Sequence, residues 1–168
     1  MRIRRLVATD ARVYWHTRNR GLKEFPDAFT TSYEEGFATS PETLAKRFGG
    51  PSSDNLMVGA FAEGDVLAGH AGFQRETRAK NRHMGTLIGM YVTPEFRGQR
   101  VGSALLDHLI GEIRRLDGME QVNLTVTHSN ESARALYLRA GFVTFGLERN
   151  ALKVGEHYVD KEHMVLML

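Results

Sequence analysis

A glycine- and arginine-containing turn between a short apolar strand and an amphipathic helix has the residue types that bind phosphate groups. The strand ends at Thr93-Pro94, and the turn 97–102 (RGQRVG) follows before an apolar pattern of helical period begins. The first N–H groups of a helix have no helical partners, and the helix dipole favours an anion beside them. The sequence therefore predicts a site for a phosphorylated ligand at this turn.

The individual residues of the turn support that interpretation. Gly98 and Gly102 let the backbone approach a ligand without obstruction by a Cβ atom. Ser103 adds a hydroxyl donor, and Arg97 and Arg100 add positive charge. The expected contacts of this turn are Arg97, Gly98, Gln99, Arg100, Val101, Gly102 and Ser103.

Two other phosphate-binding patterns do not fit the turn. A dinucleotide-binding fingerprint needs three glycines as GxGxxG directly after the strand. A nucleotide P-loop needs Gly-Lys-Ser/Thr, which does not follow here. The structural alternative is a plain strand–turn–helix corner in which the glycines serve only tight packing.

A second segment, residues 130–142 (NESARALYLRAGF), has two polar residues at helical spacing. Asn130 and Tyr137 are seven residues apart, which places them on one helix face about 10 Å apart along the axis. That spacing suits contacts with two points of one long ligand, and Ala133 is small enough to let the ligand pass closely. Asn130 is explained equally well as an N-cap, and Tyr137 alone as a core aromatic residue.

Together the two segments resemble the acetyl-CoA site of the GNAT superfamily of N-acetyltransferases. Its signature is Arg/Gln-x-x-Gly-x-Gly/Ala after a strand ending in Val-x-Pro, and residues 97–102 follow it except that Arg100 stands where glycine is usual. Because such a site uses backbone amides, we expect binding to survive if Arg100 takes an ordinary helical conformation. The second segment matches in its asparagine, its tyrosine two turns later, and its terminal Gly-Phe.

The resemblance implies cofactor contacts and a catalytic acid. The arm of acetyl-CoA would pair with the strand amides of Met90 and Val92, and the amide of Met90 or Tyr91 would stabilise the thioester oxygen. Tyr137 would protonate the departing CoA thiolate. The further implied contacts are Asn130, Ala133 and Tyr137.

The resemblance also implies an α/β fold of mixed type. Its sheet would be mixed and largely antiparallel, with six or seven strands and about four flanking helices, the acyl-CoA N-acyltransferase fold. The sheet would splay in the middle, between residues 84–92 and 122–127. The cofactor arm would lie in that splay.

The motifs do not fix the residue that takes the proton from the acceptor amine. An alkylammonium group with a pKa of about 10.4 is mostly charged at pH 7, so a side chain or water chain must accept its proton. Glu35 is our first choice, with Glu34, His70 and His83 as alternatives. The acceptor pocket is expected at Phe29, Tyr33 and Glu34, although core packing explains the two aromatic residues equally well.

Hydrophobic periodicity supplies the elements that would position these residues. Residues 26–40 are interpreted as an irregular, aromatic-rich loop, and Glu63-Gly64-Asp65 as a hairpin turn. A break is expected at Gly49-Gly50-Pro51. We expect strands at 3–7, 55–62, 66–74, 84–92, 122–127, 142–148 and 157–166, and helices at 11–24, 41–48, 101–116 and 130–140.

Composition limits the class of protein. The 168 residues are 42% apolar, which suits one domain over residues 1–168 with a sizeable core. The balance of 22 basic against 20 acidic residues argues against a nucleic-acid partner. The chain has no cysteine, so we expect no disulfide, thiolate metal site or cysteine nucleophile, and no metal. No signal peptide or membrane span is recognisable, so we expect a cytoplasmic protein without a membrane partner.

The expected reaction is direct transfer of an acetyl group from acetyl-CoA to the primary amine of a small molecule. A ternary complex is favoured because no cysteine is present to form an acyl-enzyme. Two alternatives stay open: acetylation of a protein N-terminus or lysine, and a CoA-binding sensor or interaction module that does not catalyse. The final strand could pair with a second copy, so a homodimer is possible.

Overall fold

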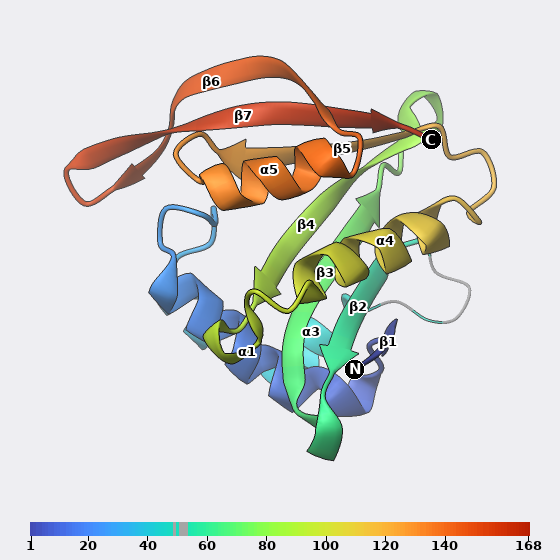
Figure 1. The fold of residues 1–168 in the computed structure, drawn as a ribbon, viewed down its shortest axis with the longest axis vertical. Coiled ribbons are helices and arrows are strands. Elements are labelled where there is room, and N and C mark those ends of the chain that lie inside the picture. Colours follow the sequence, from blue (N-terminus) through green and yellow to red (C-terminus); the bar gives the residue numbers. More distant parts are fainter. Residues whose placement is uncertain (49, 51–53) are drawn as a thin grey trace.

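A computed structural model describes residues 1–48, 50 and 54–168 of the chain (Figure 1). The predicted break at Gly49-Gly50-Pro51 lies largely outside the described residues. The strands are β1 (Arg2–Arg5), β2 (Leu56–Phe61), β3 (Leu67–Arg75), β4 (Met84–Val92), β5 (Gln121–Thr127), β6 (Val143–Val154) and β7 (His157–Met167). The α-helices are α1 (Ala11–Glu24), α2 (Tyr33–Ala38), α3 (Pro41–Ala45), α4 (Val101–Ile113) and α5 (Glu131–Arg139).

The strands form one seven-stranded sheet in the order β1-β2-β3-β4-β5-β7-β6. Neighbouring strands are antiparallel except for β4 and β5, which are parallel. The prediction of a mixed, largely antiparallel sheet is therefore confirmed.

The sheet splays between its two parallel strands. β4 and β5 pair only from Met84 to Thr86 on β4 and from Gln121 to Asn123 on β5. Both strands continue beyond those residues but diverge, as Figure 1 shows. The remaining length of β4 thus has a neighbouring strand on one side only, and the splay expected from the sequence is present.

Helices cover both faces of the sheet, because its strands are apolar on both sides. On β2, Leu56, Val58 and Ala60 pack in one core with α4 and α5. The alternate residues Met57 and Phe61 pack in a second core with α1 and α3. No helix among the described residues is long and apolar enough to cross a membrane.

One helix was not predicted from the sequence. The prediction of an irregular loop over 26–40 is wrong for Tyr33–Ala38, which form α2. The Ser32 hydroxyl accepts the Glu35 N–H at 3.2 Å, while the Glu35 carboxylate accepts the Ser32 N–H at 2.9 Å. This capping box starts α2, and its pattern Ser-x-x-Glu could have been recognised in the sequence. The α-helices in the described part therefore number five, where about four were expected.

Candidate active site

The edge of β4 at the splay presents backbone groups without a strand partner. The Thr93 N–H donates to the Ala68 carbonyl, which fixes the direction of the alternating amides along β4. Alternation turns the amides of Met90 and Val92 away from β3, toward the splay, and the amide of Tyr91 toward β3. Of the two amides expected to stabilise the thioester oxygen, the geometry favours Met90.

A β-bulge bends β4 just before these residues. His70 is paired with Tyr91, but Gly72 is paired with Ile88, so β4 has one extra residue in this stretch. Gly89 accommodates this extra residue with a φ of +58°, a conformation that glycine adopts without strain. The bulge was not foreseen, and it re-aims the end of β4 at the splay.

The predicted phosphate turn has free amides at the start of α4. The first helical hydrogen bond runs from the Ala104 N–H to the Arg100 carbonyl at 3.0 Å. The N–H groups of Val101, Gly102 and Ser103 therefore lack helical partners. Gly98 has φ +75°, so the chain makes its tight approach at a residue without a Cβ atom. This geometry suits an anion such as a pyrophosphate.

Arg100 does not take the ordinary helical conformation on which we made its role in cofactor binding depend. Its φ of +61° and ψ of +14° are left-handed, not helical. A residue with a Cβ atom has a free-energy cost of about 1–2 kcal/mol in that conformation, which explains why glycine is usual there. The exposed side chain stays available for an anion, but the backbone is strained.

We expect Arg100→Gly to raise the free energy of unfolding by about 1 kcal/mol, because glycine relieves that strain. Thermal unfolding should then shift upward by about 2–4 °C. Arg100→Ala is the matched control, since it removes the side chain but keeps the Cβ atom, and it should give no gain. Equal melting temperatures for the two variants would contradict the strain.

The Arg97 side chain, which we expected to add positive charge at the phosphate turn, has protein partners. Its Nε donates to the Val92 carbonyl at 3.0 Å, and its Nη2 pairs with Glu24 at 3.1 Å. Glu24 also accepts from the Tyr91 hydroxyl at 2.8 Å, and burial and this carboxylate raise the pKa of Tyr91. Arg97 thus ties the end of β4 to α1, and no pattern in the sequence indicated the role of Glu24. Gln99 similarly donates from its side chain to the Glu95 carbonyl at 3.0 Å.

The second predicted segment forms α5, which follows β5 directly beside the splay. The Asn130 side chain accepts the Ala133 N–H at 3.0 Å, so its interpretation as an N-cap is confirmed. The Tyr137 side chain is buried edge-on to Phe142, and its hydroxyl has no hydrogen-bond partner in the described part of the chain. Burial raises the pKa of Tyr137 to about 12. The hydroxyl therefore stays protonated at neutral pH and is free to donate.

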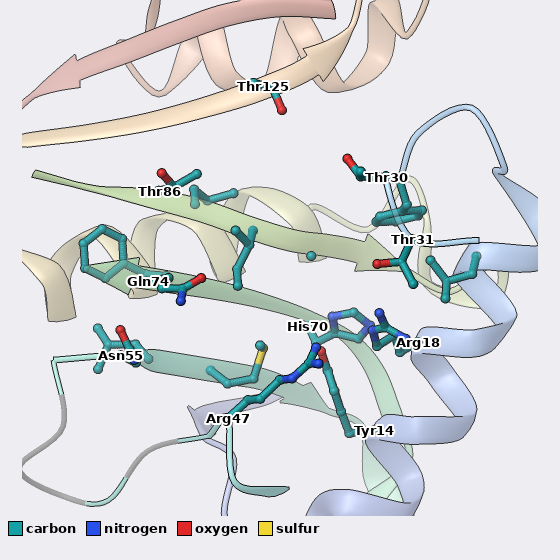
Figure 2. Close-up of a pocket in the computed structure, with 18 of the residues that line it drawn as sticks. Tyr14, Arg18, Thr30, Thr31, Arg47, Asn55, His70, Gln74, Thr86 and Thr125 are labelled. Carbon is teal, nitrogen blue, oxygen red and sulfur yellow. The ribbon is translucent and has the colours of Figure 1, made fainter. Parts of the chain in front are cut away.

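A cavity of about 700 Å³ adjoins the splay on the α1 side of the sheet (Figure 2). Gly89 and Thr125 line it from the two diverging strands, and His70 lines it from β3. The other lining residues are Tyr14, Arg18, Leu22, Phe29, Thr30, Thr31, Lys46, Arg47, Asn55, Leu56, Met57, Phe73, Gln74, Thr86, Leu87 and Ile88.

The segment between α1 and α2 forms one side of the cavity through Phe29, Thr30 and Thr31. The Thr127 hydroxyl of β5 donates to the Asp27 carbonyl at 2.6 Å. The Lys161 ammonium of β7 donates to the Thr30 hydroxyl at 3.3 Å. These contacts tie the segment to the β5–β7 half of the sheet, while α1, from which the segment continues, packs on β3 and β4.

Only part of the predicted acceptor pocket lies at the cavity. Phe29 lines it, but Tyr33, Glu34 and Glu35 do not. The Tyr33 ring packs against Phe37, 5.8 Å between centroids. Because the Glu35 carboxylate is exposed and caps α2, the geometry gives it no position from which to reach an amine in the cavity.

The cavity also has lining residues that sequence reasoning missed. Tyr14, Arg18 and Leu22 follow one another at steps of four and so share one face of α1. That spacing could have predicted that Arg18 lies on the same helix face as Tyr14 and Leu22. Arg47 follows α3 and reaches the cavity only through the packing of α3 against α1, for which the sequence has no local sign.

Comparisons with known sequences agree with this geometry. The model of the acetyltransferase (GNAT) family matches residues 21–142. Mycothiol acetyltransferase from Propionibacterium freudenreichii is 31% identical over 118 residues, which are 68% of this chain and 36% of that protein. The [ribosomal protein bS18]-alanine N-acetyltransferase of Escherichia coli is 40% identical over 65 residues, which are 39% of this chain and 43% of the relative. The chain thus spans less than half the length of either relative.

Solved structures share the fold. A GNAT-family acetyltransferase from Streptococcus pneumoniae has a TM-score of 0.89 at 24% identity, over 99% of each chain. A phosphinothricin acetyltransferase from Sinorhizobium meliloti, solved with AcCoA, has a TM-score of 0.84 at 25% identity, over 99% of this chain and 88% of that one. The splayed sheet, the phosphate turn and the family match lead to one assignment: this chain belongs to the GNAT family of acetyltransferases, which use acetyl-CoA.

Proposed function

We propose that the chain transfers the acetyl group of acetyl-CoA directly to the primary amine of a small molecule. The observation on which this depends most is the cavity of about 700 Å³ that meets the splay at Gly89 and Thr125. A small acceptor would fill such a volume with its amine at the splay. The segment held by Asp27 and Thr30 would limit access for a bulkier acceptor.

The residues present fit acetyl-CoA. The amides of Val101, Gly102 and Ser103 would hold its pyrophosphate, and the splay-facing amides of Met90 and Val92 would pair with its arm. The exposed side chain of Arg100 is placed to add charge near the phosphates. Bound acetyl-CoA supplies an activated acetyl thioester.

The chain's own groups would then guide the transfer. The free amine nitrogen forms a bond to the acetyl carbon and loses one proton to solvent water, while the bond from that carbon to sulfur breaks. The Met90 amide would stabilise charge that develops on the thioester oxygen. Tyr137 would give its proton to the departing thiolate and regain one from solvent. Direct attack accords with the absence of cysteine from the sequence.

Two further functions have some support. The similarity to the bS18-alanine acetyltransferase favours a protein N-terminus as acceptor, but it covers only 39% of this chain. A CoA-binding sensor would need only the phosphate turn and the splay. The Tyr137 hydroxyl, which has no hydrogen-bond partner among the described residues, favours catalysis over a sensor.

Thiol release from acetyl-CoA, measured against a panel of small amines, peptide N-termini and lysine peptides, separates the three functions. We expect turnover with at least one small amine and slower turnover with peptides. Faster turnover with a peptide N-terminus would replace the small-molecule proposal. Tight CoA binding without turnover on any acceptor would favour the sensor.

A further inference from the structure

One part of the cavity wall is positively charged. Arg18 from α1 and Lys46 and Arg47 from the turn after α3 line it, and no aspartate or glutamate is among the described lining residues. Figure 2 shows the side chains of Arg18 and Arg47 gathered near Tyr14 and His70. The cavity therefore offers charge to an anion and none to a cation.

The two arginines have no carboxylate partner in the described part of the chain. Nη1 of Arg18 is buried there without any hydrogen-bond partner. Three other well-packed arginines do have carboxylates within 3.1 Å: Arg4 with Asp10, Arg75 with Asp54, and Arg134 with Glu162.

The Arg18 guanidinium has the Tyr14 hydroxyl as a neutral neighbour but no carboxylate among the described residues to balance its charge. A half-buried guanidinium without a counter-charge is costly, and a second cation beside it adds repulsion. Burial and the nearby Arg47 lower the pKa of Arg18 accordingly. A planar anion would relieve both costs, because a guanidinium donates two parallel hydrogen bonds to a carboxylate. The arrangement is thus suited to a carboxylate-bearing ligand.

The same cavity reaches the splay at Gly89 and Thr125, where the amine must meet the thioester. A ligand with its anion at the arginines and its amine at the splay needs both groups on one small molecule. Resting on the acetyl transfer proposed above, we propose that the acceptor is an amino carboxylate, an amino acid or close relative, whose carboxylate Arg18 and Arg47 hold.

The charged wall also has a chemical consequence for the amine. A nearby positive charge disfavours the ammonium form and lowers its pKa. The described lining has no carboxylate to oppose that effect, and the ligand's single carboxylate would balance only one of the two guanidinium charges. Arg18 and Arg47 would therefore raise the fraction of acceptor present as the reactive free amine.

This inference can be tested with pairs of acceptors in which one member has a carboxylate and the other lacks it. Suitable pairs are methionine with 3-(methylthio)propylamine, leucine with isoamylamine, and phenylalanine with 2-phenylethylamine. Thiol release should give a kcat/KM at least tenfold higher for the acid in at least one pair. Arg18→Gln should raise the KM for that acid about 10- to 100-fold and reduce its preference over the matched amine by at least tenfold.

Controls separate charge from folding. Arg12→Gln, at an exposed position of the same helix, should leave the preference intact. Arg18→Lys should recover part of the preference, because it keeps the positive charge without the fork. Melting temperatures of all variants show whether each one folds.

Failure of this inference is distinguishable from failure of the proposed function. Preference for the plain amine in every pair, or equal losses for both members in Arg18→Gln, would overturn the carboxylate site but leave acetyl transfer standing. If no acceptor is turned over, calorimetry measures whether the same amino acids bind to the CoA-bound protein, and this result tests the carboxylate site. Binding that Arg18→Gln abolishes supports the carboxylate site, and no binding overturns it.

Discussion

Tyr137→Phe is expected to lower kcat by about a hundredfold while it changes the dissociation constant of CoA by less than threefold. The substitution removes only the hydroxyl, which in the folded protein has no hydrogen-bond partner among the described residues. Its pKa, raised to about 12 by burial, keeps it protonated across the working pH range. Loss of a positioned proton donor typically costs a factor of about 10²–10⁴.

Steady-state kinetics and calorimetric CoA binding measure the two quantities separately. Tyr158→Phe is the matched control, because it removes the same hydroxyl from an exposed tyrosine on β7, and it should leave kcat unchanged. A wild-type kcat in Tyr137→Phe would take Tyr137 out of the chemistry. A large rise in the CoA dissociation constant would assign it to binding instead.

His70 is expected to make the protein less stable in mild acid. Its ring is 1% exposed, and neither ring nitrogen has a hydrogen-bond partner in the described structure. Burial and the nearby Arg18 lower the pKa of His70 to about 4, against about 6.5 in an unfolded chain.

The sign of the pH dependence follows from this difference. Below pH 6.5 the unfolded chain takes up a proton that the folded chain refuses, so stability is complete above that pH and falls as the pH drops toward 4. The loss from His70 should be about 2 kcal/mol between pH 7.5 and pH 5, a large part of a typical total.

Urea unfolding at the two pH values measures this loss. In His70→Phe the difference between pH 7.5 and pH 5 should shrink by about 2 kcal/mol, whatever the packing change does to the absolute stability. His16→Gln, at an exposed position of α1, should keep the wild-type difference. An unchanged difference in His70→Phe would show that the ring is not the source.

Local signals in the sequence predicted most of the elements. β4 and α1 were placed at 84–92 and 11–24, the bounds that the structure has, because Pro94 ends one and Pro26 follows the other. The capping box of Ser32 and Glu35 could have predicted a further helix, α2, which the sequence analysis did not include. Alternation and helical period depend on neighbouring residues, so they could be recovered from the chain alone.

The parts that could not be predicted depend on contacts between distant residues. The bulge at Gly89 exists only in relation to the register of β3. The left-handed backbone of Arg100 reflects the path from β4 into α4, which overrides the preference of an arginine. Arg18 and Arg47 share one wall because α3 packs on α1, so the charge of the cavity emerges only in three dimensions.

The short seam between β4 and β5 has a consequence for the cohesion of the whole sheet. In the described part of the chain, three residue pairs of β4 and β5 are the strand pairing between β1–β4 and β5–β7, so hydrogen exchange should be faster along this seam than along the longer strand pairs. A ligand arm paired with Met90 and Val92 would act as an additional strand and lend its binding free energy to the joint. Acetyl-CoA would then be a structural component of the sheet during each catalytic cycle, and its departure as CoA would loosen the same joint through which product must leave.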